Sequence, residues 1–223
     1  FQTTAGTGRL SDAKPILYSF RRCPYAMRAR LAIYVSGIQV QLREILLRDK
    51  APELLSASPK GTVPVLITSN EIIEESFDIM IWSLKRGDPE HWLDMPNEGY
   101  EWILKNDGPF KDALDHTKYF VRFPELDAKL EQAKALKFLT DLNVQIGKSN
   151  WMFGEGCSLA DMAVLPFIRQ FSNIDKNWFY AQDLPNVHRW LDHFLQTDLF
   201  INIMKKYDFW IEESTPVLFS RVG

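Results

Sequence analysis

Cys23 is the residue of this sequence best placed for covalent chemistry, in a stretch that reads Arg-Arg-Cys-Pro-Tyr-Ala over residues 21–26. The run 16–20 before it has strand character, and Pro24 suits a first helical turn, where its missing N–H loses no partner. A thiol at the start of a helix faces free backbone N–H groups and the positive end of the helix dipole. Since Arg22 adds positive charge, the position indicates a reactive thiolate rather than a structural cysteine.

Ala26 occupies the place where a dithiol oxidoreductase carries its second cysteine. Disulfide exchange at Cys23 would therefore need an external thiol, attacking through a mixed disulfide. The other cysteine, Cys157, precedes an apolar helical stretch and is interpreted as a small packed hydrophobic residue. Two cysteines cannot build a disulfide framework.

Two further dipeptides could bind a ligand. If the peptide bond before Pro64 is cis, the backbone N–H and C=O of Val63 can pair with an extended peptide-like ligand; a trans edge-strand proline is the equal alternative. Ser76 suits a helix N-cap, whose free amides can receive a carboxylate, and Glu75 beside it could receive an ammonium. Together they would hold an amino-acid zwitterion, although a simple cap next to a solvated glutamate also fits.

The elements that must position these residues change character along the chain. Residues 15–87 alternate strand-like and helix-like runs in the order β-α-β, then β-β-α, which predicts a parallel pair with a crossover helix and an added hairpin. After a linker bracketed by residues 87–89 and 94–96, no convincing strand occurs. Residues 96–223 predict an all-helical domain. In it, 159–171 is apolar on nearly every face, behind a capping box at Ser158 and Asp161.

Composition narrows the function classes. With 223 residues, 46% of them hydrophobic, and a net charge of −3, the chain can bury a real core and is no general nucleic-acid or membrane binder. No apolar run reaches the length of a membrane span, and residues 1–14, a polar and presumed flexible segment, show no signal-peptide core. The four histidines form no metal-ligand set, and phosphate loops and nucleophile elbows are absent. We expect a metal-free cytoplasmic protein.

The order of these motifs resembles that of a glutathione transferase: Cys-Pro after the first strand, Val-Pro forty residues on, Glu-Ser before a helix, then an all-helical domain. A cysteine at the end of the first strand resembles the cysteine-type, omega-like classes, as do Arg28, Arg30 and Leu31. The resemblance implies a thioredoxin-like N-terminal α/β domain, an all-α C-terminal bundle, a homodimer and glutathione as cosubstrate.

The resemblance also implies a role for each matched residue. Cys23 would form the mixed disulfide with glutathione, and Val63, before an expected cis Pro64, would pair its backbone with the cysteinyl part of the tripeptide. Glu75 and Ser76 would hold the γ-glutamyl end. Lys50, or Arg48 in its place, would reach the glycyl carboxylate. A second-substrate pocket is expected against the first long helix of the helical domain, with the candidates Tyr100, Phe110 and His116. Lys60 stands where an aromatic residue is common in omega-like chains.

The resulting hypothesis is a glutathione-dependent thiol transferase or reductase, with dehydroascorbate-like or small disulfide acceptors. Conjugation of glutathione to electrophiles is the second enzyme hypothesis. A non-catalytic interaction module is the rival from another class, because fold does not fix function. Such a module would not need Cys23 together with Glu75 and Ser76.

Overall fold

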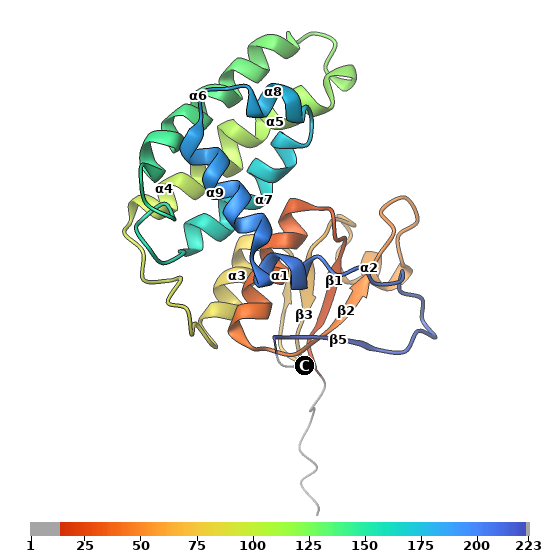
Figure 1. The fold of residues 1–223 in the computed structure, drawn as a ribbon. Helices are drawn as coiled ribbons and strands as arrows, with labels where there is room; N and C mark the ends of the chain where they lie inside the picture. Colours follow the sequence, from red (N-terminus) through yellow and green to blue (C-terminus); the bar gives the residue numbers. More distant parts are fainter. Residues whose placement is uncertain (1–13, 222–223) are drawn as a thin grey trace, which may run out of the picture.

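The computed structural model describes residues 14–221, and the segment 1–14 expected to be flexible lies outside them except for its last residue. A small sheet covered by helices forms the N-terminal part, and the remaining helices pack as a bundle beside it (Figure 1). The α/β-plus-helical architecture predicted above is confirmed.

The N-terminal part follows the predicted order. Its elements are β1 (Ile16–Ser19), α1 (Pro24–Ser36), β2 (Val40–Glu44), α2 (Pro52–Ala57), β3 (Val65–Ile67), β4 (Ile72–Ile73) and α3 (Ser76–Leu84). Strand β1 runs parallel to β2 and antiparallel to β3, and β3 and β4 form the hairpin. A turn of four residues joins β1 to the crossover helix α1. Cys23 is the last residue of this turn and therefore lies at the carboxyl end of β1.

A fifth strand corrects the expectation of an all-helical second half. β5 (Val217–Phe219) lies near the C-terminus and pairs antiparallel with β2, so that the sheet order is β4-β3-β1-β2-β5 (Figure 1). Three residues are too few to show a two-residue period, and the strand exists because β2 offers an open edge.

The helical part contains more helices than its periodic apolar runs predicted. It comprises α4 (Glu98–Lys105), a π-helical turn (Asn106–Phe110), α5 (Lys111–Lys118), a 3₁₀ turn (Phe120–Arg122), α6 (Ala128–Ile146), α7 (Leu159–Ser172), α8 (Lys176–Tyr180), α9 (Pro185–Gln196) and α10 (Asp198–Ile203). The wide π-helical turn contains Pro109, which has no N–H for a regular helical ladder. Helix α7 is buried on nearly all faces and begins with the predicted capping box of Ser158 and Asp161.

Two buried arginines fasten α1 to the helical part. Arg28 Nε donates to the Ala163 carbonyl at 2.6 Å, and its two terminal nitrogens contact the Asp107 carboxylate at 2.9 and 2.5 Å. Arg30 donates to the Ile203 carbonyl at 3.1 Å and pairs with Glu44 of β2. The helix that carries Cys23 at its start is therefore held between the sheet and the bundle.

Candidate functional site

Cys23 is the N-cap residue of α1, as its sequence position predicted. Its backbone N–H donates to the Phe20 carbonyl at 2.9 Å, which closes the turn between β1 and α1. Its Sγ lies 3.7 Å from the carbonyl oxygen of Val63, and the Val63–Pro64 peptide bond is cis. The chain thus brings Cys23 and Val63 together although forty positions separate them.

The protonation of Cys23 is decided by burial. Burial raises the pKa of the thiol, and this effect exceeds the opposing ones. The backbone N–H groups of Tyr25 and Ala26 lower the pKa, as expected at a helix start, and the charges of Lys111 and Lys118 lower it further. In the free protein the thiol form is favoured, which corrects the expected thiolate, and the helpful cations come from the helical part rather than from Arg22.

A cavity of about 400 Å³ opens at Cys23, between the two parts of the chain. One wall is the turn into α1, with Phe20, Arg22 and Tyr25; the other is α5 and the segment after it, with Lys111, Lys118 and Tyr119. Burial raises the pKa of Tyr25 to about 12, so its hydroxyl remains a hydrogen-bond donor. Gln170 of α7 also lines the cavity, and its Oε1 is buried without a partner among residues 14–221.

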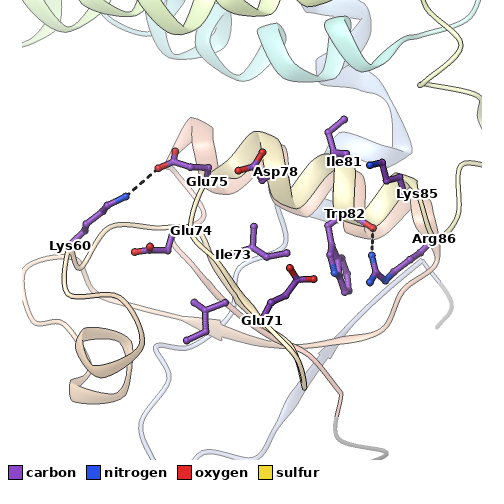
Figure 2. A pocket seen from close by; sticks show the side chains of 11 residues that line it. Lys60, Glu71, Ile73, Glu74, Glu75, Asp78, Ile81, Trp82, Lys85 and Arg86 are labelled. Carbon is purple, nitrogen blue, oxygen red and sulfur yellow. Dashed lines mark hydrogen bonds and ion pairs between the residues drawn. The ribbon is translucent and has the colours of Figure 1, made fainter.

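Glu75 and Ser76 begin α3, with their roles shifted by one position from the prediction. Glu75 is the N-cap residue and Ser76 the first helical residue, and no side chain caps this helix. Ser76 is buried, whereas the Glu75 carboxylate is exposed and lies 3.4 Å from Lys60 Nζ (Figure 2). An ammonium group arriving at Glu75 would meet Lys60 there.

Lys50 reaches over Gly61, close to the loop that carries Val63. Its Cδ and Nζ lie 3.1 Å from the point where a β-carbon on Gly61 would stand, and Leu55 Cδ2 lies 2.8 Å from that point. Gly61 has a φ of +59°, a backbone conformation that side chains disfavour. A glycine here leaves room for the lysine.

The three expected second-substrate residues do not line the Cys23 cavity. Phe110 is buried in the bundle and stacks on Phe138 at 4.5 Å between ring centroids. His116 Nδ1 lies 2.9 Å from Glu131 Oε2, between α5 and α6, and Tyr100 packs edge-on against Phe77 of α3. The expectation placed the second-substrate pocket against the first long helix of the helical part, but these three side chains lie on faces of that region that point away from the Cys23 cavity.

The wall of the cavity formed by α5 corresponds to a charge pattern in the sequence. Lys111, Asp115 and Lys118 recur at i, i+4 and i+7, which predicts a charged stripe on one face of α5. Gln170 had no such signal, because α7 reads as a buried helix throughout.

Cys157 has the structural role predicted for it. It packs against the main core and accepts a hydrogen bond from Trp92 Nε1 at 3.1 Å. Burial, followed by the charge of Glu90, raises its pKa to about 12. Near neutral pH the thiol form is therefore strongly favoured over the nucleophilic thiolate.

A second hollow, of about 550 Å³, lies on the outer face of β4 and α3 (Figure 2). Its apolar part consists of Ile72, Ile73, Ile81 and Trp82, and charged side chains from α3 and from the segments that flank β4 and α3 surround it. The Arg86 guanidinium lies 3.8 Å from the centre of the Trp82 ring. The Trp82 Nε1 is buried and has no hydrogen-bond partner in the described chain. Within residues 14–221 no cluster of three His, Cys, Asp or Glu side chains could hold a metal ion, and no helix is long and apolar enough to cross a membrane.

Comparison with known families matches both parts of the chain. The model of the glutathione S-transferase N-terminal domain matches residues 17–90, and that of the C-terminal domain matches residues 112–193. A probable glutathione S-transferase, parA of Nicotiana tabacum, is 27% identical over 179 residues, which are 75% of this chain and 74% of that protein. Glutathione S-transferase U22 of Arabidopsis thaliana is 27% identical over 172 residues, 72% of this chain and 75% of that protein.

Solved structures agree in fold. A glutathione transferase family member from Pseudomonas fluorescens, crystallised with two glutathione molecules bound, superposes with a TM-score of 0.75 at 18% identity, covering 89% of this chain and 95% of that one. Poplar glutathione transferase F1 superposes with a TM-score of 0.72 at 17% identity, covering 86% of this chain and 97% of that one. The two sequence relatives are plant proteins, and the comparisons do not confirm the omega-like class.

Proposed function

Because the chain belongs to the glutathione S-transferase superfamily, whose cosubstrate is glutathione, we propose that it is a glutathione-dependent thiol transferase that acts through Cys23. One observation carries the proposal: the Cys23 sulfur stands at the start of α1, 3.7 Å from the Val63 carbonyl, on the wall of an open cavity. A cysteine packed for structure alone, like Cys157, would not face such a cavity.

The proposed reaction proceeds by two thiol–disulfide exchanges. The Cys23 thiolate attacks the glutathione sulfur of a mixed disulfide; the new S–S bond forms as the old one breaks, and the substrate leaves as a thiolate that takes a proton from water. A second glutathione thiolate then attacks the same sulfur, which forms oxidised glutathione and releases the Cys23 thiolate. The sum is one mixed disulfide and one glutathione converted to a free thiol and oxidised glutathione.

The tripeptide would be held by residues that surround Cys23. We place its cysteinyl backbone against Val63 and its γ-glutamyl end at Glu75 and Ser76, where the free amides of α3 receive the carboxylate. Lys50, supported by Gly61, would receive the glycyl carboxylate. Lys60 would have to release Glu75 when the γ-glutamyl ammonium arrives.

Conjugation of glutathione to electrophiles is a second candidate, and the raised pKa of Cys23 favours it. A protonated thiol can donate a hydrogen bond to the glutathione thiolate and so stabilise that nucleophile without forming a disulfide. The names of the plant relatives fit this activity as well.

Replacing Cys23 by serine separates the two functions. A serine hydroxyl can hydrogen-bond a thiolate but cannot form a disulfide, so Cys23→Ser should lose glutathione-dependent reduction of a small mixed disulfide by at least about 100-fold. Conjugation to 1-chloro-2,4-dinitrobenzene should fall far less. The matched control, Cys157→Ser, should retain both activities.

Three other results would change the conclusion. Disulfide reduction that persists in Cys23→Ser contradicts the thiol-transferase proposal. Conjugation without any disulfide reduction in the native protein moves the second candidate to first place. A protein that neither turns over nor binds glutathione would be the interaction module.

We also propose that the protein is a homodimer that uses the hollow of β4 and α3. This face exposes half of the Ile72 side chain, at 50%, and holds the unpartnered Trp82 Nε1. Figure 2 shows Lys85 and Arg86 at one end of the hollow and Glu74 and Glu75, with Lys60, at the other, and a second copy could pair these charges.

A further inference from the structure

We infer that the cavity beside Cys23 selects a negatively charged second substrate, and that Arg22 and Lys118 are the residues that select it. The inference rests on the proposed function, since it names the class of molecule that meets Cys23: a thiol or disulfide that carries a carboxylate or sulfonate near its sulfur.

The cavity carries two positive charges that nothing in the described chain neutralises. Three of its side chains are basic and one is acidic; Lys111 is paired with Asp115, four residues along the same helix. Arg22 and Lys118 have no carboxylate within 4 Å among residues 14–221. Instead the Arg22 guanidinium lies 5.2 Å from the centre of the Phe20 ring, and the Lys118 ammonium 4.9 Å from that of Tyr119.

Folding does not account for this arrangement. The chain as a whole is acidic, with a net charge of −3, so a local positive excess is contrary to its average composition. Lys118 is half-buried, and partial desolvation of a cation without an anionic partner costs free energy. The Tyr119 ring recovers part of that cost for Lys118, and the Phe20 ring holds the exposed Arg22 guanidinium at the cavity.

The position of the charges relates them to the reaction. Lys111 and Lys118 both act on the Cys23 sulfur electrostatically, so the cavity and the nucleophile share one field. A concave site lined by one sign of charge raises the local concentration of oppositely charged substrates. An anionic group that leaves with, or arrives with, the reacting sulfur would lie between Arg22, from the turn into α1, and Lys118, from α5.

Labelling of Cys23 tests the charge selection without requiring turnover. In a Cys157→Ser background, Cys23 is the only thiol, and we would measure its second-order rate with an anionic (ethylsulfonate) and a cationic (ethyltrimethylammonium) methanethiosulfonate reagent. Each rate is divided by that of 2-mercaptoethanol with the same reagent. The normalised ratio of the anionic to the cationic rate should be about five or more, and it should fall toward one as added salt screens the electrostatic field.

The variants locate the selection. Lys118→Gln and Arg22→Gln should each lower the ratio about threefold, while Lys137→Gln, on an exposed face of α6, should leave it unchanged. A ratio near one in the unsubstituted chain, or an equal fall for all three variants, would overturn the inference.

Turnover extends the test to the substrate class. The second substrates are preformed mixed disulfides of glutathione with 3-mercaptopropionate, 2-mercaptoethanol and cysteamine, which share a two-carbon stem and carry a negative, neutral and positive group. Because the three thiols also differ in pKa and therefore in leaving-group ability, each kcat/KM is divided by the rate of uncatalysed exchange of the same disulfide with glutathione. We expect the normalised kcat/KM to decrease in that order and Lys118→Gln to compress the differences. Equal values for the three contradict the anionic class, whereas absence of turnover with all three contradicts the proposed function and leaves the labelling ratio to decide the inference.

Discussion

At the scale of single residues, the behaviour of Cys23 results from opposing effects of the same fold. The helix start and the two lysines of α5 stabilise its thiolate, while burial between the turn and Val63 favours the thiol. Burial exceeds the others in the free protein. A ligand that brings hydrogen-bond donors to the sulfur would shift this balance toward the thiolate.

The pH dependence of Cys23 labelling checks this balance. Because the pKa lies above its ordinary value, the rate with neutral iodoacetamide should keep rising beyond the pKa of free cysteine, about 8.5, instead of levelling off below it. Lys118→Gln should move the midpoint higher still, since removing a cation destabilises the thiolate. Stopped labelling followed by intact mass in a Cys157→Ser background gives the midpoint, and one below that of free cysteine would contradict the role given to burial.

Gly61 allows a second residue-scale prediction. Gly61→Ala should cost about 1 to 2 kcal/mol of unfolding free energy, because the backbone is left-handed; the added carbon would also push aside the exposed tip of Leu55, 2.8 Å away. It should also raise KM for glutathione several-fold by displacing Lys50. Gly37→Ala is the matched control: its φ is +73° but nothing lies within 4 Å, so about 1 kcal/mol and an unchanged KM are expected. Equal KM values for the two variants would remove Lys50 from the binding site.

Local chemistry was predictable where neighbours in sequence decide it, and unpredictable where distant segments meet. Cys23 and Pro24 predict the start of a helix from adjacent residues alone, and in the structure they are the N-cap and the first residue of α1. The cavity wall opposite them is built by α5, about ninety residues away. The charged stripe of that helix is visible in the sequence, but nothing local indicates that Lys118 rather than His116 faces Cys23. The net pKa of Cys23 depends on its burial and on the charges of Lys111 and Lys118, which that helix brings from far along the chain.

At the scale of elements, α7 is organised by one carboxylate. Asp161 accepts hydrogen bonds from the Ser158 N–H and Oγ, at 2.9 and 2.6 Å, from the Met152 N–H at 2.9 Å and from Trp190 Nε1 at 2.8 Å. It therefore joins the start of α7 to the loop before it and to α9. The sequence predicted the cap, but the bonds to Met152 and Trp190 depend on packing that no local pattern encodes.

Asp161→Asn should destabilise the protein by about 3 kcal/mol, because an amide nitrogen would face donors that now share a buried carboxylate. The exposed N-cap Asp127 of α6, which accepts a single bond from Lys129 N–H at 2.8 Å, is the matched control. Asparagine caps helices as well as aspartate, so Asp127→Asn should cost less than about 0.5 kcal/mol. Urea unfolding followed by tryptophan fluorescence compares the two, and similar losses would show that Asp161 is only a cap.

At the scale of the whole molecule, the cavity exists because two parts of the chain are held in one relative position. The C-terminal segment contributes to this, because β5 extends the sheet. The Trp210 ring lies 4.0 Å from the Arg43 guanidinium, and the Trp210 backbone N–H donates to the Glu44 carbonyl at 2.7 Å. The sequence predicted two domains but not this return of the chain, since strand β5 is too short to recognise.

Arg28 makes the corresponding contact on the side of the cavity. It is fully buried, donates two hydrogen bonds to the Asp107 carboxylate, and its guanidinium lies 4.5 Å from the centre of the Phe167 ring. Asp107 belongs to the turn that leads into α5, so this pair sets where Lys111 and Lys118 stand relative to Cys23.

Breaking this pair should therefore change both stability and reaction geometry. Arg28→Met should cost about 3 to 4 kcal/mol, because the Ala163 carbonyl and the Asp107 carboxylate both lose their donor, and Asp107→Asn about 2. The double variant should lose at least about 1.5 kcal/mol less than the sum of the single ones, as expected for two groups in direct contact. Additive losses would show that the pair does not couple the two parts of the chain.

The same variants should distinguish domain positioning from simple loss of folding. At a temperature where Asp107→Asn stays folded, we expect kcat/KM for disulfide reduction to fall about tenfold, since displaced cations no longer face the cavity beside Cys23. Labelling of Cys23 by neutral iodoacetamide, measured at a pH above the Cys23 midpoint where the lysines no longer change the thiolate fraction, should change much less, because α1 keeps its place on the sheet through Arg30 and Glu44. A parallel fall of both rates would mean that the pair supports α1 itself rather than the position of α5.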